Sequence, residues 1–271
     1  MSVLSIVVLA CYLACAAWLV SSAFNPDEHR ASSWRVAGLA LGTAALILHA
    51  VLLRQGVFAK PTISFTTTET ASLIGWLMGL IALGLAWLRP RFSSIGAVLM
   101  AVAGVVAMAT TGGSGGYALT RQNWEVAAHI ALSTLAYALI MIAAVLAIAL
   151  ALLDQRLRHR RPLGWLRAIP SLEALEGGTF QALGAGFAVL TLALFSGFIF
   201  VNDLFAQHLF HKTVLSCVAW IIFAVVLFGR WRFGWRGRIA TSWTLGGFAL
   251  LGLAYFGSKI VLESVLGRHW T

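Results

Sequence analysis

Eight long apolar segments constrain the fold of this 271-residue chain more than any other feature. A helix of about 20 apolar residues crosses the hydrocarbon core of a bilayer. Sixty per cent of the residues are hydrophobic and only 10% are charged, a balance that soluble domains do not show. We therefore predict an all-α fold, a polytopic membrane helix bundle of about eight transmembrane helices that forms a single integral membrane domain over residues 1–271. The expected spans are residues 2–24, 34–53, 69–88, 93–110, 125–153, 180–201, 213–229 and 241–266.

The distribution of basic residues between the loops predicts the orientation of these spans. Loops after the first, third, fifth and seventh spans hold 13 Lys and Arg residues, whereas the opposite loops and the tail hold five. Cytoplasmic loops carry the excess of basic residues, so we expect both termini outside. Arg30 is the first basic residue of the chain, and a cleaved signal peptide begins with a basic region. We expect residues 2–24 to remain as a membrane helix.

The net charge of +10 indicates contact with a membrane surface rather than with nucleic acid. Most of the excess lies in two short segments next to predicted spans, "DQRLRHRRPLGWLR" and "GRWRFGWRGR". Arginine interleaved with tryptophan at helix ends is typical of anchoring at an anionic leaflet of the lipid bilayer. A third segment, "SLEALEGGTFQALG", has roughly helical spacing of apolar residues, and we predict a short amphipathic helix on the inner surface there.

Four of the seven histidines fall near the predicted outer ends of three helices: His49, His129, His208 and His211. Imidazoles in a helix bundle ligate metal or haem, carry protons, or hydrogen-bond between helices. Two neutral imidazoles from different helices are the ligands of a six-coordinate haem. His129 and His211 are our first choice as axial ligands of the haem iron, because each begins a span that runs inward. His49 is the alternative axial ligand, or a residue that hydrogen-bonds to the ligand. His208 and His211 could together bind a small metal ion such as zinc, but the sequence offers no further ligands to complete that site.

Three basic residues on the same side are candidate partners for haem propionates. Arg121 and Lys212 lie at the predicted outer ends of spans and are suited to bind carboxylates if haem is present. Lys259 lies four residues before Glu263, so it has two interpretations: a structural ion pair within the last span, or a third propionate contact.

Two stretches of this sequence resemble the cytochrome c assembly protein family, membrane proteins that handle haem. They are "NWEVAAHIALSTLAYALIMIAAVLAIALALLDQRLR" and "HKTVLSCVAWIIFAVVLFGRWRFGWRGRIATSWTLGGFALLGLAYFGSK". The resemblance covers residues 40–266, is strongest over 124–260, and is closest to a bacterial inner-membrane subgroup. It includes the pattern H-x-x-x-S-x-x-A-Y from His129 to Tyr137 and the pair "GWRG" and "AYFGS".

The resemblance implies a multi-pass protein of the bacterial inner membrane with haem b bound near the outer face, and it maps an axial-ligand position of the family onto His129. It implies haem binding and haem handling rather than catalysis, with another inner-membrane or periplasmic protein as a partner. One departure concerns the loop "NDLFAQHLFHKT", which lacks the tryptophan-rich segment that haem-delivering members carry. Two alternatives therefore stay open: a haem-free accessory or regulatory subunit acting on a partner, and a single-haem electron-transfer protein.

Overall fold

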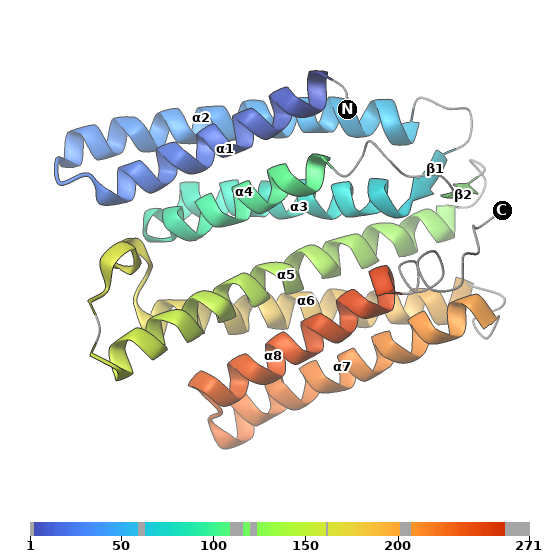
Figure 1. The fold of residues 1–271 in the computed structure, drawn as a ribbon. Helices are drawn as coiled ribbons and strands as arrows, with labels where there is room; N and C mark the ends of the chain where they lie inside the picture. Colours follow the sequence, from blue (N-terminus) through green and yellow to red (C-terminus); the bar gives the residue numbers. More distant parts are fainter. Residues whose placement is uncertain are drawn as a thin grey trace. The chain divides into compact units, whose positions relative to one another are not determined.

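Eight α-helices and one small antiparallel sheet make up the described part of the computed structural model, which comprises residues 3–58, 63–108, 116–119, 124–160, 162–200 and 207–257 (Figure 1). Ile63 of the first strand pairs with Leu119 of the second. The predicted all-α membrane bundle is confirmed. The helices are α1 (Val3–Phe24), α2 (Glu28–Leu53), α3 (Thr67–Leu88), α4 (Ser93–Met108), α5 (Trp124–Arg158), α6 (Leu172–Phe200), α7 (Gln207–Phe233) and α8 (Gly237–Gly252), and the strands are β1 (Ile63–Thr66) and β2 (Gly116–Leu119).

Short helical turns of other types continue or connect several of these helices. The 3₁₀ turns η2 (Pro90–Phe92) and η4 (Gly164–Ala168) lie in the connections before α4 and α6. The π turns η1 (Arg54–Phe58) and η5 (Leu253–Gly257) follow α2 and α8 directly. π turns are rare and often accompany functional sites, and η5 contains Tyr255.

Seven of the helices, α1 to α7, are long and apolar enough to cross a membrane. The eighth predicted span, residues 241–266, corresponds to α8, whose α-helical part has 16 residues and passes directly into η5. The rest of that span lies outside the described residues.

Three helices, α2, α6 and α7, begin six to eight residues before the apolar segments that predicted them. Asp27 caps α2, because its side chain accepts hydrogen bonds from the backbone N–H groups of His29 and Arg30 at 3.0 and 3.3 Å. The short amphipathic helix predicted within residues 171–184 is not a helix of its own, because α6 runs unbroken from Leu172 to Phe200. Hydropathy marks only the apolar part of a helix, whereas backbone hydrogen bonding continues through polar residues beyond it.

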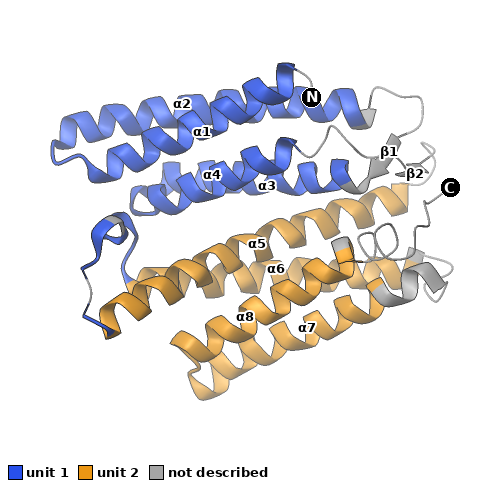
Figure 2. Ribbon diagram, viewed as in Figure 1, with its two compact units in different colours: residues 1–121, 159–171 blue, residues 122–158, 172–271 orange. Residues whose placement is uncertain are grey.

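The chain divides into two compact units (Figure 2). Unit 1 contains residues 1–121 and 159–171, and unit 2 contains residues 122–158 and 172–271. Each unit holds four consecutive helices. The predicted single domain over residues 1–271 stays a prediction, and each unit is described by itself.

In unit 1, α1 packs against α2 and α4, while α3 packs against α4 and α2. The four helices come together at Gly42 of α2. A Cβ atom there would lie 2.7 to 2.9 Å from Leu83 of α3, Cys15 of α1 and Met100 of α4. Helices in a membrane associate through such close packing, because lipid tails are as apolar as the side chains and the hydrophobic effect does not drive the helices together.

In unit 2, α5 packs against α6 and α8, while α7 packs against α8 and α6. Gly186 of α6 faces Ile140 of α5 so closely that a Cβ atom would lie 2.7 Å from the Ile140 side chain and 3.2 Å from its backbone nitrogen. The absence of a side chain at Gly186 therefore sets the distance between α5 and α6.

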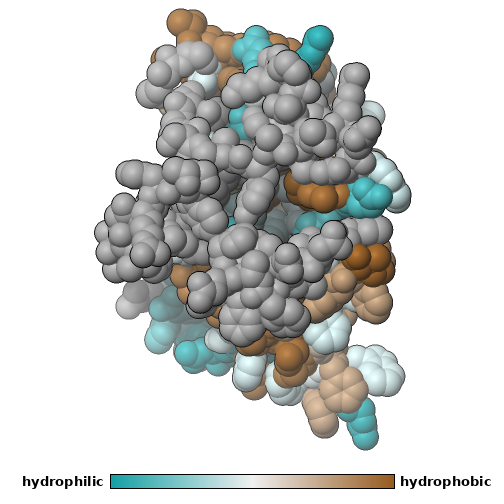
Figure 3. Space-filling view, turned by 90° about the vertical axis from the view of Figure 1, so that its right-hand side faces the viewer, coloured by the Kyte–Doolittle hydropathy of each residue, from teal (hydrophilic) through white to brown (hydrophobic). Residues whose placement is uncertain are grey.

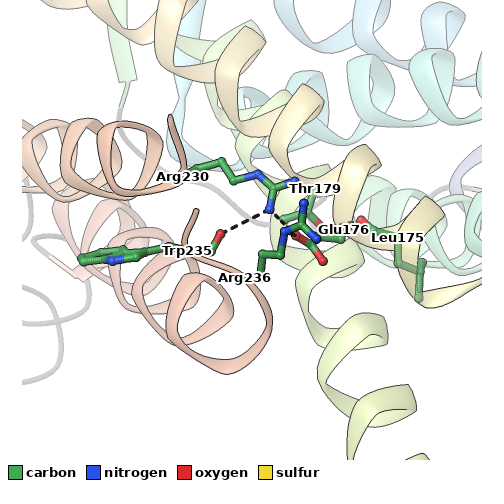
Figure 4. Close-up of polar contacts among 6 residues, drawn as sticks. All are labelled: Leu175, Glu176, Thr179, Arg230, Trp235 and Arg236. Carbon is green, nitrogen blue, oxygen red and sulfur yellow. Dashed lines mark hydrogen bonds and ion pairs between the residues drawn. The ribbon is translucent and has the colours of Figure 1, made fainter. Parts of the chain in front are cut away.

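An ion pair joins the beginning of α6 to the end of α7 (Figure 4). Arg230 donates to Glu176 at 2.5 Å, and its guanidinium carbon lies 4.7 Å from the centre of the Phe180 ring. Arg236, the residue just before α8, has its Nε atom 3.6 Å from the same carboxylate. One carboxylate thus connects three helices of unit 2.

We expect Gly186→Ala to lower the stability of unit 2 by about 1–3 kcal/mol, because the added methyl group overpacks the contact between α5 and α6. Gly184→Ala in the same helix is the matched control, since a Cβ atom there meets nothing within 4 Å. Removing that glycine should be neutral or stabilise the helix by about 0.5–1 kcal/mol. Unfolding of the detergent-purified protein, followed by circular dichroism, measures both. Equal stability of the two variants would contradict the packing argument.

Candidate functional site

His129 is held against α6 through one of its ring nitrogens. Its Nδ1 atom lies 3.0 Å from the carbonyl oxygen of Ala193 and 3.0 Å from the hydroxyl oxygen of Ser196. A carbonyl oxygen only accepts, so Nδ1 carries the hydrogen and donates it. Ser196 donates its own hydrogen to Ala193 O at 2.8 Å, which leaves its oxygen able to accept as well.

This arrangement assigns the tautomer of the His129 ring. With the hydrogen on Nδ1, the lone pair of the neutral imidazole is on Nε2. The contact of Nε2 with Ser133 Oγ is long, at 3.5 Å. Metal-ligating histidines characteristically donate their other N–H group to a carbonyl or carboxylate, which fixes the ring and raises its basicity. The bond from His129 Nδ1 to the Ala193 carbonyl oxygen is a bond of this kind.

Gly197 provides the space that the His129 ring occupies. A Cβ atom at this position would lie 3.0 Å from Cε1 and 3.4 Å from Nδ1 of the ring. Any larger residue would displace the imidazole from α6. Ser196 and Gly197 were not predicted as site residues, because only the register of α5 on α6 brings them to His129 from 67 and 68 positions away in the sequence.

A second group of contacts joins α5, α7, α8 and the turn η5 within unit 2. The hydroxyl of Tyr137 donates to the carbonyl oxygen of Leu251 at 2.9 Å. The rings of Tyr137 and Tyr255 meet edge to face, 5.6 Å apart, and the ammonium of Lys212 lies 5.8 Å from the centre of the Tyr255 ring. The motif that ends in Tyr137 and the motif "AYFGS" are therefore in contact, although 118 residues separate the two tyrosines in the sequence.

Lys212 is the propionate candidate whose side chain the structure describes. It is half-buried at the beginning of α7, and the described residues contain no carboxylate that pairs with it. A cation above an aromatic ring keeps its donors available to an anion. Lys212 can therefore bind a carboxylate group of a ligand without breaking an ion pair within the described residues.

His49 lies in unit 1 and has a different environment. It is fully buried, its Nδ1 atom is 3.0 Å from the hydroxyl of Tyr12, and its Nε2 atom is 2.8 Å from the hydroxyl of Ser72. Both ring nitrogens are thus hydrogen-bonded, one as donor and one as acceptor. Iron coordination by His49 would require one of these bonds to break, so the geometry favours His129 over His49 as a ligand.

Several predicted site residues cannot be placed. Arg121 and Lys259 lie outside the described residues. His208 and His211 belong to the first turns of α7, but their side chains lie outside the described part. His211 is in unit 2 with His129 and directly precedes Lys212. Figure 3 shows one face of the molecule, on which the described side chains are partly hydrophilic and partly hydrophobic.

Comparison with known proteins gives one family and several relatives. The family model described as cytochrome C assembly protein matches residues 92–266. The inner membrane protein YpjD of Escherichia coli strain K12 is 38% identical over 137 residues, which are 51% of this chain and 52% of the relative. An uncharacterized 28.8 kDa protein of Azospirillum brasilense is 35% identical over 141 residues, with the same shares. This chain therefore spans about half the length of these two relatives.

More distant relatives carry a functional name. The cytochrome c biogenesis protein CcsA of Mesostigma viride is 26% identical over 105 residues, 38% of this chain and 34% of the relative. No solved structure gives a significant match. The resemblance stated from the sequence is confirmed. Together with seven apolar helices, these matches identify a multi-pass protein of the bacterial inner membrane.

We predict that His129 of the purified protein is the Nδ1–H tautomer, which nitrogen-15 NMR of histidine-labelled protein distinguishes from the Nε2–H form. Gly197→Ala should shift the His129 ring signals, because a methyl group would occupy the place of the ring. Gly184→Ala on the same helix should leave them unchanged. An Nε2–H ring in the unsubstituted protein would overturn the assignment.

Proposed function

Because the chain belongs to the cytochrome C assembly protein family, we propose that it binds and handles haem in cytochrome c biogenesis, with a b-type haem near the predicted outer face. Family membership supports the haem-handling role. The observation that carries the site assignment is the hydrogen bond from His129 Nδ1 to the carbonyl oxygen of Ala193. That bond leaves the Nε2 lone pair for iron.

His129 and His211 are the proposed axial ligands. Both residues belong to unit 2 and both lie in the first turns of their helices. Ser196 and Gly197 position the His129 ring, while the Ala193 carbonyl holds its tautomer. A haem with two histidine ligands is six-coordinate and has a characteristic visible spectrum.

Basic side chains are the proposed partners of the haem propionates. Lys212 is the first of them, since its ammonium lies above the Tyr255 ring. Arg121 and Lys259 are proposed for the same role from the sequence alone. A charge-assisted hydrogen bond to a propionate is about twice as strong as a neutral one, so these residues would fix the orientation of the macrocycle.

We expect the protein purified from haem-replete cells to show Soret and α bands. His129→Ala and His211→Ala should each lose most of the bound haem, because each removes an iron ligand. His49→Gln is the control, since both nitrogens of that ring are already hydrogen-bonded within unit 1. It should keep the full spectrum.

Three results would contradict this proposal. A haem-free native protein would reject haem binding itself. Unchanged spectra in both His129→Ala and His211→Ala would reject the ligand pair and leave haem binding intact. Loss of the spectrum in His49→Gln, with the fold preserved by circular dichroism, would move the site to unit 1.

A second candidate function is that of a haem-free accessory or regulatory subunit that acts on a partner protein. The observation that favours it is the segment of residues 201–212, which contains no tryptophan where haem-delivering members carry several. Co-purification of a stoichiometric partner without Soret absorbance would support this function over haem handling. A single-haem electron-transfer role would instead require a reversible redox titration of the bound haem.

A further inference from the structure

The turn between α7 and α8 has a defined shape. Gly234, with φ of 65°, ends α7 in the left-handed conformation, and its N–H group bonds to the carbonyl oxygen of Arg230 at 3.2 Å. Trp235 then folds back onto α7, so that a Cβ atom at Gly229 would lie 2.5 Å from the indole. The same indole lies 6.4 Å from the ring of Trp243 on α8. The turn is therefore held by packing as well as by backbone bonds.

Four arginines lie at this turn, and the Glu176 carboxylate pairs with two of them, Arg230 and Arg236. Arg230 bonds to this carboxylate and also donates to the carbonyl oxygen of Trp235 at 3.4 Å (Figure 4). Arg236 approaches the same carboxylate, but 71% of its side chain is exposed. Arg232 and Arg238 are exposed, and no described carboxylate pairs with either. Four arginines against one carboxylate leave three uncompensated positive charges.

Large apolar side chains next to these arginines in the sequence are exposed. Trp231 is 81% exposed and Phe233 is 66% exposed, while Trp243 is exposed to a smaller extent. The guanidinium carbon of Arg232 lies 5.9 Å from the centre of the Phe233 ring. Exposed aromatic rings beside cations at the end of a membrane helix are expected at the depth of the lipid headgroups.

The other basic juxtamembrane segment has a different arrangement. At the end of α5, Arg158 forms an ion pair with Asp154 at 2.8 Å. Residues 154–160 contain no Trp, Phe or Tyr. The end of α5, residues 154–160, thus carries positive charge without the aromatic side chains that would lie between lipid chains, and Trp165 of the same basic segment belongs to η4.

We infer that the α7–α8 turn is a binding site for anionic phospholipid, formed by Arg232, Arg236 and Arg238 with Trp231 and Phe233. The guanidinium groups contact the phosphate and any further anionic group of the lipid head, and the rings lie against its glycerol and upper acyl chains. Glu176 contributes by holding Arg230, which keeps the end of α7 next to α6. The site is independent of haem and concerns the opposite end of α7 from Lys212.

Native mass spectrometry of the full-length protein in detergent, titrated with phosphatidylglycerol or phosphatidylcholine, tests this inference. We expect the native protein to prefer phosphatidylglycerol. Changing Arg232, Arg236 and Arg238 together to Gln should weaken phosphatidylglycerol binding by about tenfold or more and leave phosphatidylcholine binding unchanged. Higher ionic strength should reduce the preference of the native protein, since the exposed charges are screened.

The matched control changes Arg156, Arg158 and Arg160, at the end of α5, to Gln and so removes the same number of positive charges. It should change phosphatidylglycerol binding by less than about twofold on the same scale. Replacing Arg232, Arg236 and Arg238 by Lys retains the charge and should restore most of the preference, which separates loss of charge from loss of fold. No preference for phosphatidylglycerol in the native protein, or equal losses in the two Gln triples, would overturn the inference.

Discussion

A polar side chain inside a membrane bundle must find its partner within the protein, because the hydrocarbon offers none. His49 and His129 both obey this constraint, with different outcomes. The ring of His49 has hydroxyl groups at both nitrogens, from helices on either side of it in the sequence. The ring of His129 is anchored firmly at Nδ1 alone, by a backbone carbonyl and a hydroxyl of α6. The same requirement for partners therefore yields a ring with short hydrogen bonds at both nitrogens in unit 1, and in unit 2 a ring whose Nε2 atom has only a 3.5 Å contact with Ser133 Oγ.

Close helix packing makes both arrangements possible. Gly104 of α4 brings the backbone against Tyr12, since a Cβ atom there would lie 2.7 Å from the Tyr12 Cβ atom, and Tyr12 is the partner of His49. Gly186 and Gly197 bring α6 against α5 along one face, and the second of them contacts the His129 ring. Small residues thus set interhelical distances that in turn set the geometry of the polar contacts. The site depends on packing that extends well beyond its own residues.

The sequence predicted the membrane spans well and the contacts of the site only in part. Apolar runs mark the spans because the hydrocarbon requires them, but helices such as α6 extend beyond the apolar run, where hydropathy carries no signal. His129 was predicted because an intramembrane imidazole is conspicuous. Ser196 and Gly197 were not, because a serine and a glycine in an apolar span are ordinary residues until the register of two helices is known. The contact between Tyr137 and Tyr255 similarly requires the packing of α5 against the end of α8.

The extent of the family match bears on which unit carries the common function. The matched residues, 92–266, include α4 and every helix of unit 2, whereas α1, α2 and α3 precede them. His129, Tyr137, Lys212 and Tyr255 all lie within the match, and His49 with its partners Tyr12 and Ser72 lies outside it. A site that serves the function shared by the family should lie within the matched residues, which favours the candidate site of unit 2 over His49. The saturated hydrogen bonding of His49 is an independent reason for the same choice, since it rests on geometry and not on similarity.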